Sequence, residues 1–163
     1  MAALEPGAFA PEIKLKGVDG KTYSVKEALL TGPVLLAFYK EDCRTCQLTM
    51  PFLERLWLAY KPGFHLWAVS QDDKAGTRKY ASANGLTYTF LLDDRKYTAS
   101  NAYGLTSVPS IFLVDLNQVV QRTLVGFSKR DLNELAAEVA ELAGGIPMAI
   151  VRPEDNAPEF QHE

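Results

Sequence analysis

The stretch from Val34 to Cys46 reads VLLAFYKEDCRTC, and it decides how the rest of the sequence is interpreted. Its first six residues, up to Tyr39, are all apolar, and turn-forming or charged residues bound them on both sides. A short apolar run with such boundaries is typical of a strand buried on both faces of a sheet. From Cys43 onward, apolar side chains recur at helical spacing up to about Tyr60, which predicts a helix. The two cysteines therefore fall at a junction between a buried strand and a helix.

This junction gives a physical reason for reactive cysteine chemistry. The backbone N–H groups and the dipole at a helix N-terminus favour the thiolate form of Cys43, and Arg44 adds a positive charge beside it. Cys46 lies one helical turn further on, within reach of a disulfide with Cys43. We therefore expect Cys43 to be the nucleophile and Cys46 to be the resolving thiol.

A zinc site or a purely structural role accounts less well for the cysteine pair. Zinc prefers four ligands, and the only other soft candidates are His65 and His162. Two incidental structural cysteines are less expected than a redox pair in an alternating strand and helix pattern. A non-catalytic protein that binds a metal or a partner stays open as a third hypothesis. No glycine-rich phosphate loop follows any strand pattern, so we expect no metal and no cofactor.

Length and composition describe an ordinary globular chain. The 163 residues fit one domain, and 47% of them are apolar and 23% charged, which excludes an intrinsically disordered protein. The net charge of −3 offers no basic face for nucleic acid. The longest apolar run is far below the roughly 20 residues of a membrane helix, and no signal-peptide pattern opens the chain. We expect a cytoplasmic protein, or an exported one if a signal sequence was removed.

Strand and helix patterns alternate along the rest of the chain. The further predicted strands cover residues 13–16, 21–23, 64–70, 88–92, 110–115 and 119–125, and the further helices cover 24–30, 72–84, 93–103 and 128–143. This order indicates an α/β fold with a mixed sheet.

The last part of the sequence has a different character. Residues 146–163 hold three prolines and no periodic pattern, so we predict an extended C-terminal tail after a domain of residues 1–145. Docking of the tail on the domain or on a partner is one possibility. A flexible terminus is the interpretation we favour.

A second motif joins the cysteine pair. Val108-Pro109 directly precedes the strand pattern at 110–115, Pro51 lies inside the helix after the cysteines, and residues 124–132 read as a strand, a glycine and a helix start. In order and spacing these features resemble the thioredoxin fold over residues 11–142. The N-terminal strand pair and the inserted helix and strand resemble TlpA/ResA-type thiol–disulfide oxidoreductases, which are related to the AhpC/TSA peroxiredoxin branch. The resemblance implies a three-layer α/β/α sandwich with a mixed central sheet.

The resemblance also implies roles for individual residues. Pro109 is expected in the cis form and is counted with the two cysteines as catalytic. The backbone of Val108 is expected to pair with an extended substrate segment. The remaining expected substrate contacts are Tyr39, Arg44, Thr45 and Gly126. The implied partners are a protein that bears a disulfide or dithiol and an upstream thiol reductant or oxidant, acting on a monomer.

Two positions depart from the pattern of that family. Ala37 and Thr49 stand where thioredoxins and many TlpA/ResA-type proteins carry an aspartate and a glutamate. The proton acceptor for Cys46 is therefore unassigned. Glu41 and Asp42 are the nearest carboxylates in the sequence, and we interpret them as solvated loop charges.

A thiol peroxidase of the peroxiredoxin type is the nearest rival hypothesis. The peroxiredoxin pattern Pro-x-x-x-Thr-x-x-Cys places a proline and a threonine before the reactive cysteine, and Leu36 and Lys40 occupy those positions here. Without the threonine hydroxyl, peroxide loses its main side-chain hydrogen-bond partner, so we expect only slow reaction with peroxide. The leading hypothesis is a thiol–disulfide oxidoreductase that exchanges electrons with protein disulfides or dithiols.

Overall fold

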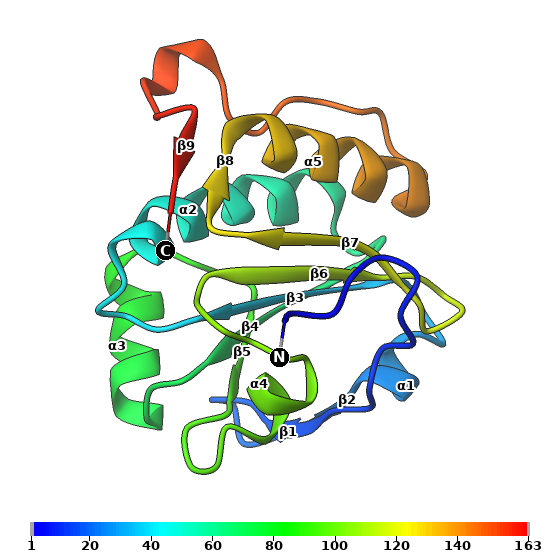
Figure 1. The fold of residues 1–163 in the computed structure, drawn as a ribbon, viewed down its shortest axis with the longest axis vertical. Coiled ribbons are helices and arrows are strands. Elements are labelled where there is room, and N and C mark those ends of the chain that lie inside the picture. Colours follow the sequence, from blue (N-terminus) through cyan, green and yellow to red (C-terminus); the bar gives the residue numbers. More distant parts are fainter. Residues whose placement is uncertain (1, 163) are drawn as a thin grey trace.

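The central sheet places the apolar strand before the cysteines in the middle of the molecule. A computed structural model describes residues 2–162 of the chain (Figure 1). The sheet has the order β5-β4-β3-β6-β7, with bounds Thr89–Leu92, His65–Ser70, Val34–Tyr39, Ser110–Val114 and Val120–Val125. Strands β3, β4 and β5 run parallel, and β6 and β7 pair antiparallel. Because β3 has neighbours on both edges and layers on both faces, all six of its residues are buried.

Helices cover both faces of this sheet. On one face lie α2 (Arg44–Tyr60) and α5 (Lys129–Ala143), which contact each other (Figure 1). On the other face lie α1 (Val25–Ala28), α4 (Thr98–Ala102) and the hairpin of β1 (Lys14–Lys16) and β2 (Thr22–Ser24). Helix α3 (Lys74–Ala83) joins β4 to β5. The predicted three-layer sandwich with an N-terminal strand pair and an inserted helix and strand is confirmed.

The start of helix α4 differs from the prediction. The sequence predicts a helix from Asp93 or Asp94, but α4 begins at Thr98, after Tyr97 in the left-handed region with φ of 50°. Asp93 lies five residues before the helix but still caps it, because its carboxylate accepts the N–H groups of Ala99 at 3.0 Å and Ser100 at 2.8 Å. An acidic side chain thus stabilises the first turn without being its N-cap residue.

The C-terminal segment packs on the domain, which is the alternative that the sequence pattern did not favour. It contains a short 3₁₀ helix, η1 (Pro153–Asp155), and a strand, β9 (Phe160–Gln161), which pairs with β8 (Phe127–Ser128). Ile150 and Val151 are buried in the core of the protein. Two adjacent apolar residues are too few to form a periodic pattern, so local sequence signals missed this packing.

Within residues 2–162, the structure contains no helix that is both long enough and apolar enough to cross a membrane.

Candidate active site

Cys43 is the N-cap residue of helix α2. Its backbone is extended, with φ of −95° and ψ of 115°, and its sulfur accepts the backbone N–H of Cys46 at 3.0 Å. The thiol also lies 3.5 Å from the carbonyl oxygen of Val108, to which it donates. The side chain is 8% exposed. A sulfur in this position receives a helix N–H directly, which stabilises negative charge on it.

Cys46 lies one turn inside the helix and is completely buried. Burial, and second the hydrogen bond with Cys43, raise the pKa of the Cys46 thiol well above its ordinary value. Desolvation has this effect because it disfavours the charged form of a group. The two thiols therefore differ in burial and in hydrogen bonding: the Cys43 sulfur is slightly exposed and accepts a helix N–H, whereas the Cys46 thiol is completely buried and has a raised pKa.

The loop before β6 brings Val108 and Pro109 beside the cysteines. The Val108–Pro109 peptide bond is cis, which is the isomer that the family resemblance implies. The N–H of Gly126 donates to the carbonyl of Pro109 at 3.0 Å, so the end of β7 supports this loop. These contacts hold the backbone of Val108 next to the sulfur of Cys43.

A groove of about 1110 Å³ opens at the cysteine pair. Four of the predicted site residues line it, namely Cys43, Arg44, Thr45 and Val108. Sequence reasoning did not anticipate two further groups in its lining, which are Tyr97, Ser100 and Asn101 around α4, and Pro158, Gln161 and His162 in the C-terminal segment. No local signal marks these residues, because they reach the groove only through the packing of distant elements.

Two predicted substrate contacts lie outside the groove. Tyr39 is completely buried, and its ring packs against Tyr80 and Phe90 with ring centroids 5.1 and 5.7 Å apart. The prediction that Tyr39 touches a substrate is therefore wrong, because the residue ends the central strand and points into the core. Gly126 is also buried, and its N–H is used by Pro109. Its position supports the loop and does not form the surface of the groove.

The positions that depart from the family pattern bring no carboxylate to Cys46. Ala37 is buried in β3, and the hydroxyl of Thr49 donates to the carbonyl of Thr45 at 2.7 Å inside the helix. The side chain of Asp42 is 79% exposed, and Glu41 is exposed as well. These loop carboxylates are solvated, as the sequence predicts.

The surroundings of the cysteines do not resemble a metal site. In the described part of the chain, no three or more His, Cys, Asp or Glu side chains gather in one place. His65 bonds to the hydroxyl of Thr31 at 2.8 Å. It opens β4 opposite Val34, at the far end of the sheet from Cys43. The groove thus exposes one thiol, that of Cys43, beside a helix N-terminus and the exposed Arg44, and the second thiol lies buried behind it.

Together, the fold and the site define a thioredoxin-fold protein with a redox-active dithiol. The profile of the AhpC/TSA family matches residues 6–123, and the chain belongs to this family. A relative named thiol–disulfide oxidoreductase ResA, from Geobacillus thermodenitrificans, is 30% identical over 135 residues, which are 81% of this chain and 76% of the relative. The cysteine pair of this chain and its similarity to proteins named thiol–disulfide oxidoreductase identify the chain as a thiol–disulfide oxidoreductase.

Two further comparisons place the chain within the family. A putative peroxiredoxin, bcp, from Helicobacter pylori is 28% identical over 134 residues, which are 75% of this chain and 88% of that protein. The crystal structure of a putative thiol:disulfide interchange protein, DsbE, from Chlorobium tepidum is 25% identical and superposes with a TM-score of 0.77, covering 87% of this chain and all of that one (100%).

Proposed function

We propose that the chain exchanges two electrons with disulfides of protein substrates, with Cys43 as the attacking sulfur and Cys46 as the resolving one. The observation that carries this assignment is the contrast between the two thiols. Cys43 lies at the helix N-terminus and lines the groove, whereas Cys46 is buried behind it. Nucleophilic attack requires access to the groove and a donor that faces the sulfur, and only Cys43 has both.

In the first step, the Cys43 thiolate attacks one sulfur of a substrate disulfide. A mixed disulfide forms, the substrate bond breaks, and the leaving sulfur departs as a thiolate that takes up a proton. In the second step, Cys46 loses its proton and attacks the sulfur of Cys43. The Cys43–Cys46 disulfide forms and the second substrate thiol leaves. Two electrons have then moved from the pair to the substrate, the proton of Cys46 and one proton from solvent complete the two substrate thiols, and the reverse sequence oxidises a dithiol.

The backbone next to the nucleophile suits an extended substrate. Val108 lies just before β6, and it lines the groove within 3.5 Å of the Cys43 sulfur. An extended segment that pairs with this backbone adds a strand at the groove and brings its own cysteine towards Cys43. Specificity then depends on the groove and not on a deep pocket.

The same proposal extends to partners and assembly. The proposed working unit is a monomer. The oxidised pair needs an external thiol reductant to begin another cycle of reduction, or an oxidant for the reverse direction.

The test is reduction of insulin disulfides by the wild type, Cys43→Ser and Cys46→Ser, with dithiothreitol as the final reductant. We expect Cys43→Ser to reduce the rate to that of dithiothreitol alone, because serine cannot form the mixed disulfide. Thermal unfolding of each variant controls for loss of fold. Unchanged activity in Cys43→Ser overturns the proposal.

The relationship to peroxiredoxins calls for a second assay. Leu36 is buried in β3, and Lys40 stands where the peroxiredoxin pattern carries threonine. We expect consumption of hydrogen peroxide by the reduced protein to be slow and no faster than that of an ordinary accessible thiol. Rapid turnover with peroxide and none with insulin would make thiol peroxidase the leading function in place of thiol–disulfide oxidoreductase.

A further inference from the structure

The C-terminal segment reaches the active site, although it lies outside the matched part of the family. The family match ends at residue 123. After helix α5, the chain crosses back over α2 and α5 and ends beside the N-terminus of α2 (Figure 1). Three of its residues, Pro158, Gln161 and His162, line the groove together with Cys43.

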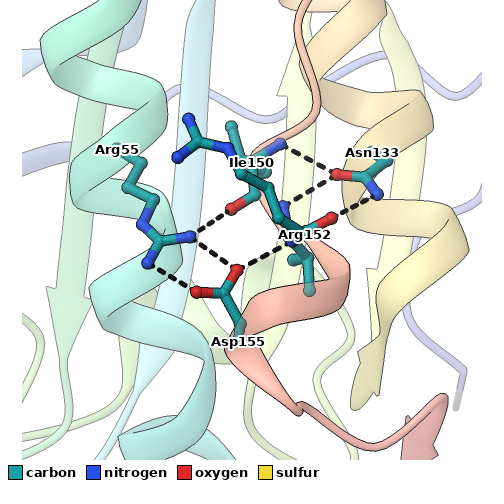
Figure 2. Close-up of polar contacts among 6 residues, drawn as sticks. Arg55, Asn133, Ile150, Arg152 and Asp155 are labelled. Atoms are coloured by element: carbon teal, nitrogen blue, oxygen red, sulfur yellow. Dashed lines mark hydrogen bonds and ion pairs between the residues drawn. The ribbon is translucent and has the colours of Figure 1, made fainter.

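The first part of the segment is firmly attached, and we call residues 150–155 the anchor. Ile150 is completely buried, and the side chain of Asn133 in α5 accepts its N–H at 2.9 Å. Arg55 in α2 donates to the Ile150 carbonyl at 2.9 Å and makes a two-fold ion pair with Asp155, at 2.7 and 2.8 Å. Figure 2 shows these contacts converging from two helices on the anchor. Both burial and polar contacts therefore fix its position.

The last part is attached more lightly, and we call residues 157–162 the arm. Its strand, β9, pairs with only the two residues of β8. The hydroxyl of Thr45, inside the cysteine motif, donates to the carbonyl of His162, and the side-chain amide of Gln161 donates to the same hydroxyl at 2.9 Å. The Phe160 side chain is 52% exposed. A few hydrogen bonds of about 1 kcal/mol each hold the arm, and none of its side chains from Ala157 to His162 is buried in the core.

The position of the arm bears on access to the nucleophile. The arm occupies one edge of β8, and Gln161, one of the paired residues, lines the groove. An open strand edge is a place where an extended segment of another chain can pair, and β9 fills it. Thr45 is only 2% exposed, although it lies between the two cysteines in the motif. The arm therefore covers one side of the motif.

We infer that the arm is a specificity-determining wall of the groove, which admits small disulfides and keeps disulfides of bulky folded proteins away from Cys43. This inference rests on the proposed function for its substrate class. Because the anchor holds the start of the arm, the arm can leave the groove without unfolding the domain. Reaction with a bulky partner is then limited by the fraction of molecules in which the arm is open.

The main test uses a chain that ends after Asn156, so that the anchor stays and the arm is removed. We expect the rate of insulin reduction to rise about tenfold, the factor for an arm that is open in about one molecule in ten. The rate with hydroxyethyl disulfide should change less than about twofold on the same argument. Glu154→Gln, in the exposed part of the anchor, is the matched control with an intact arm. Equal changes with both substrates, no change, or a loss with insulin alone overturns the inference.

A second measurement separates this inference from the proposed function. In a Cys46→Ser background, Cys43 is the only thiol of the chain. Its rate of modification is compared between iodoacetamide and a maleimide that carries a polyethylene glycol chain. Truncation should increase the rate of Cys43 modification by the bulky maleimide about tenfold more than the rate of modification by iodoacetamide. This result stands even if no variant reduces any disulfide, in which case only the proposed function fails. Equal acceleration of the two reagents refutes the wall.

A full-length variant covers the case in which the truncated chain does not fold. Gln161→Pro removes the side-chain amide that bonds Thr45 and places a proline in β9, where it cannot donate to β8. Gln161→Ala removes only the amide. We expect the preference for the bulky reagent to follow the order Gln161→Pro, Gln161→Ala, wild type. A wild-type profile in Gln161→Pro contradicts the inference.

Discussion

The groove has two walls that are built in different ways. The motif wall, formed by Cys43, Arg44, Thr45 and Val108, rests on the junctions of a buried sheet with its helix and loop. The arm wall, formed by Pro158, Gln161 and His162, follows directly after the anchor, which is bonded to helices α2 and α5. The motif wall is fixed by continuous core packing, whereas the arm wall depends on a two-residue strand pair and a few part-buried hydrogen bonds. A rigid wall suits the chemistry, and a lightly held one suits selection between partners.

The largest expected effect concerns the motif wall and follows from Cys46→Ser. The variant should form a mixed disulfide between Cys43 and a substrate protein but fail to resolve it, so that turnover stops after one event. Serine is close to cysteine in size, so the buried position stays filled. Non-reducing electrophoresis with a disulfide-bearing substrate measures the trapped species. The double variant with Cys43→Ser is the control and should trap nothing.

The next effect concerns the anchor and follows from Ile150→Ala. The side chain is completely buried, so its truncation should lower the free energy of unfolding by about 2–4 kcal/mol through lost burial and a cavity. Urea unfolding of the variant and wild type measures this loss. Ile146→Ala, at a position that is 85% exposed in the same segment, is the matched control. Equal stability of Ile150→Ala and wild type shows that the anchor does not belong to the domain core.

A smaller effect of pH follows from the ion pair of the anchor. The hydrogen bond from Arg55 lowers the pKa of Asp155 to about 2 from the ordinary value of 3.8. A carboxylate whose pKa is lower in the folded state than in the unfolded state stabilises the fold. This contribution is complete at pH values above the unfolded-state pKa, and it is lost as the pH falls towards the folded-state pKa. At about pH 5 the melting temperature of the wild type should therefore be higher than that of Asp155→Asn. This difference in melting temperature should shrink between about pH 4 and pH 2.

Thermal unfolding across this pH range gives the comparison, with Glu154→Gln as a neighbouring carboxylate control. If the difference in melting temperature between wild type and Asp155→Asn is unchanged at about pH 2, the charge of Asp155 does not hold the anchor.

The smallest effect is expected at the arm. Lys129 and Glu159 form an ion pair of 3.8 Å in which the Glu159 side chain is 84% exposed. Exposed pairs of this kind contribute about 0–1 kcal/mol, so Glu159→Gln should leave both stability and the substrate preference of the groove within error. The backbone bond from Lys129 N–H to the Glu159 carbonyl, 3.0 Å long, is kept in this variant. A clear change in substrate preference would show that charge holds the arm.

Prediction from sequence succeeded where the structure depends on local pattern. The apolar run at 34–39, the helical spacing after Cys43 and the helix pattern over 128–143 each report a conformation through neighbouring residues, and the structure confirms all three. The family resemblance predicts Tyr39 at the substrate surface, whereas the structure places it in the core. Alternation along a strand and burial on both faces decide where a side chain points, and family position alone does not.

The sequence by itself determined the two thiols, their order along helix α2 and the strand that precedes them, because short-range spacing and apolar periodicity carry that information. Only the tertiary structure decided that the chain after α5 returns to the active site. Arg55 and Asp155 are 100 residues apart in the sequence, and Thr45 and Gln161 are 116 apart. Contacts at such separations leave no periodic trace in the sequence, and they form only when the packed sheet and helices bring the distant segments together.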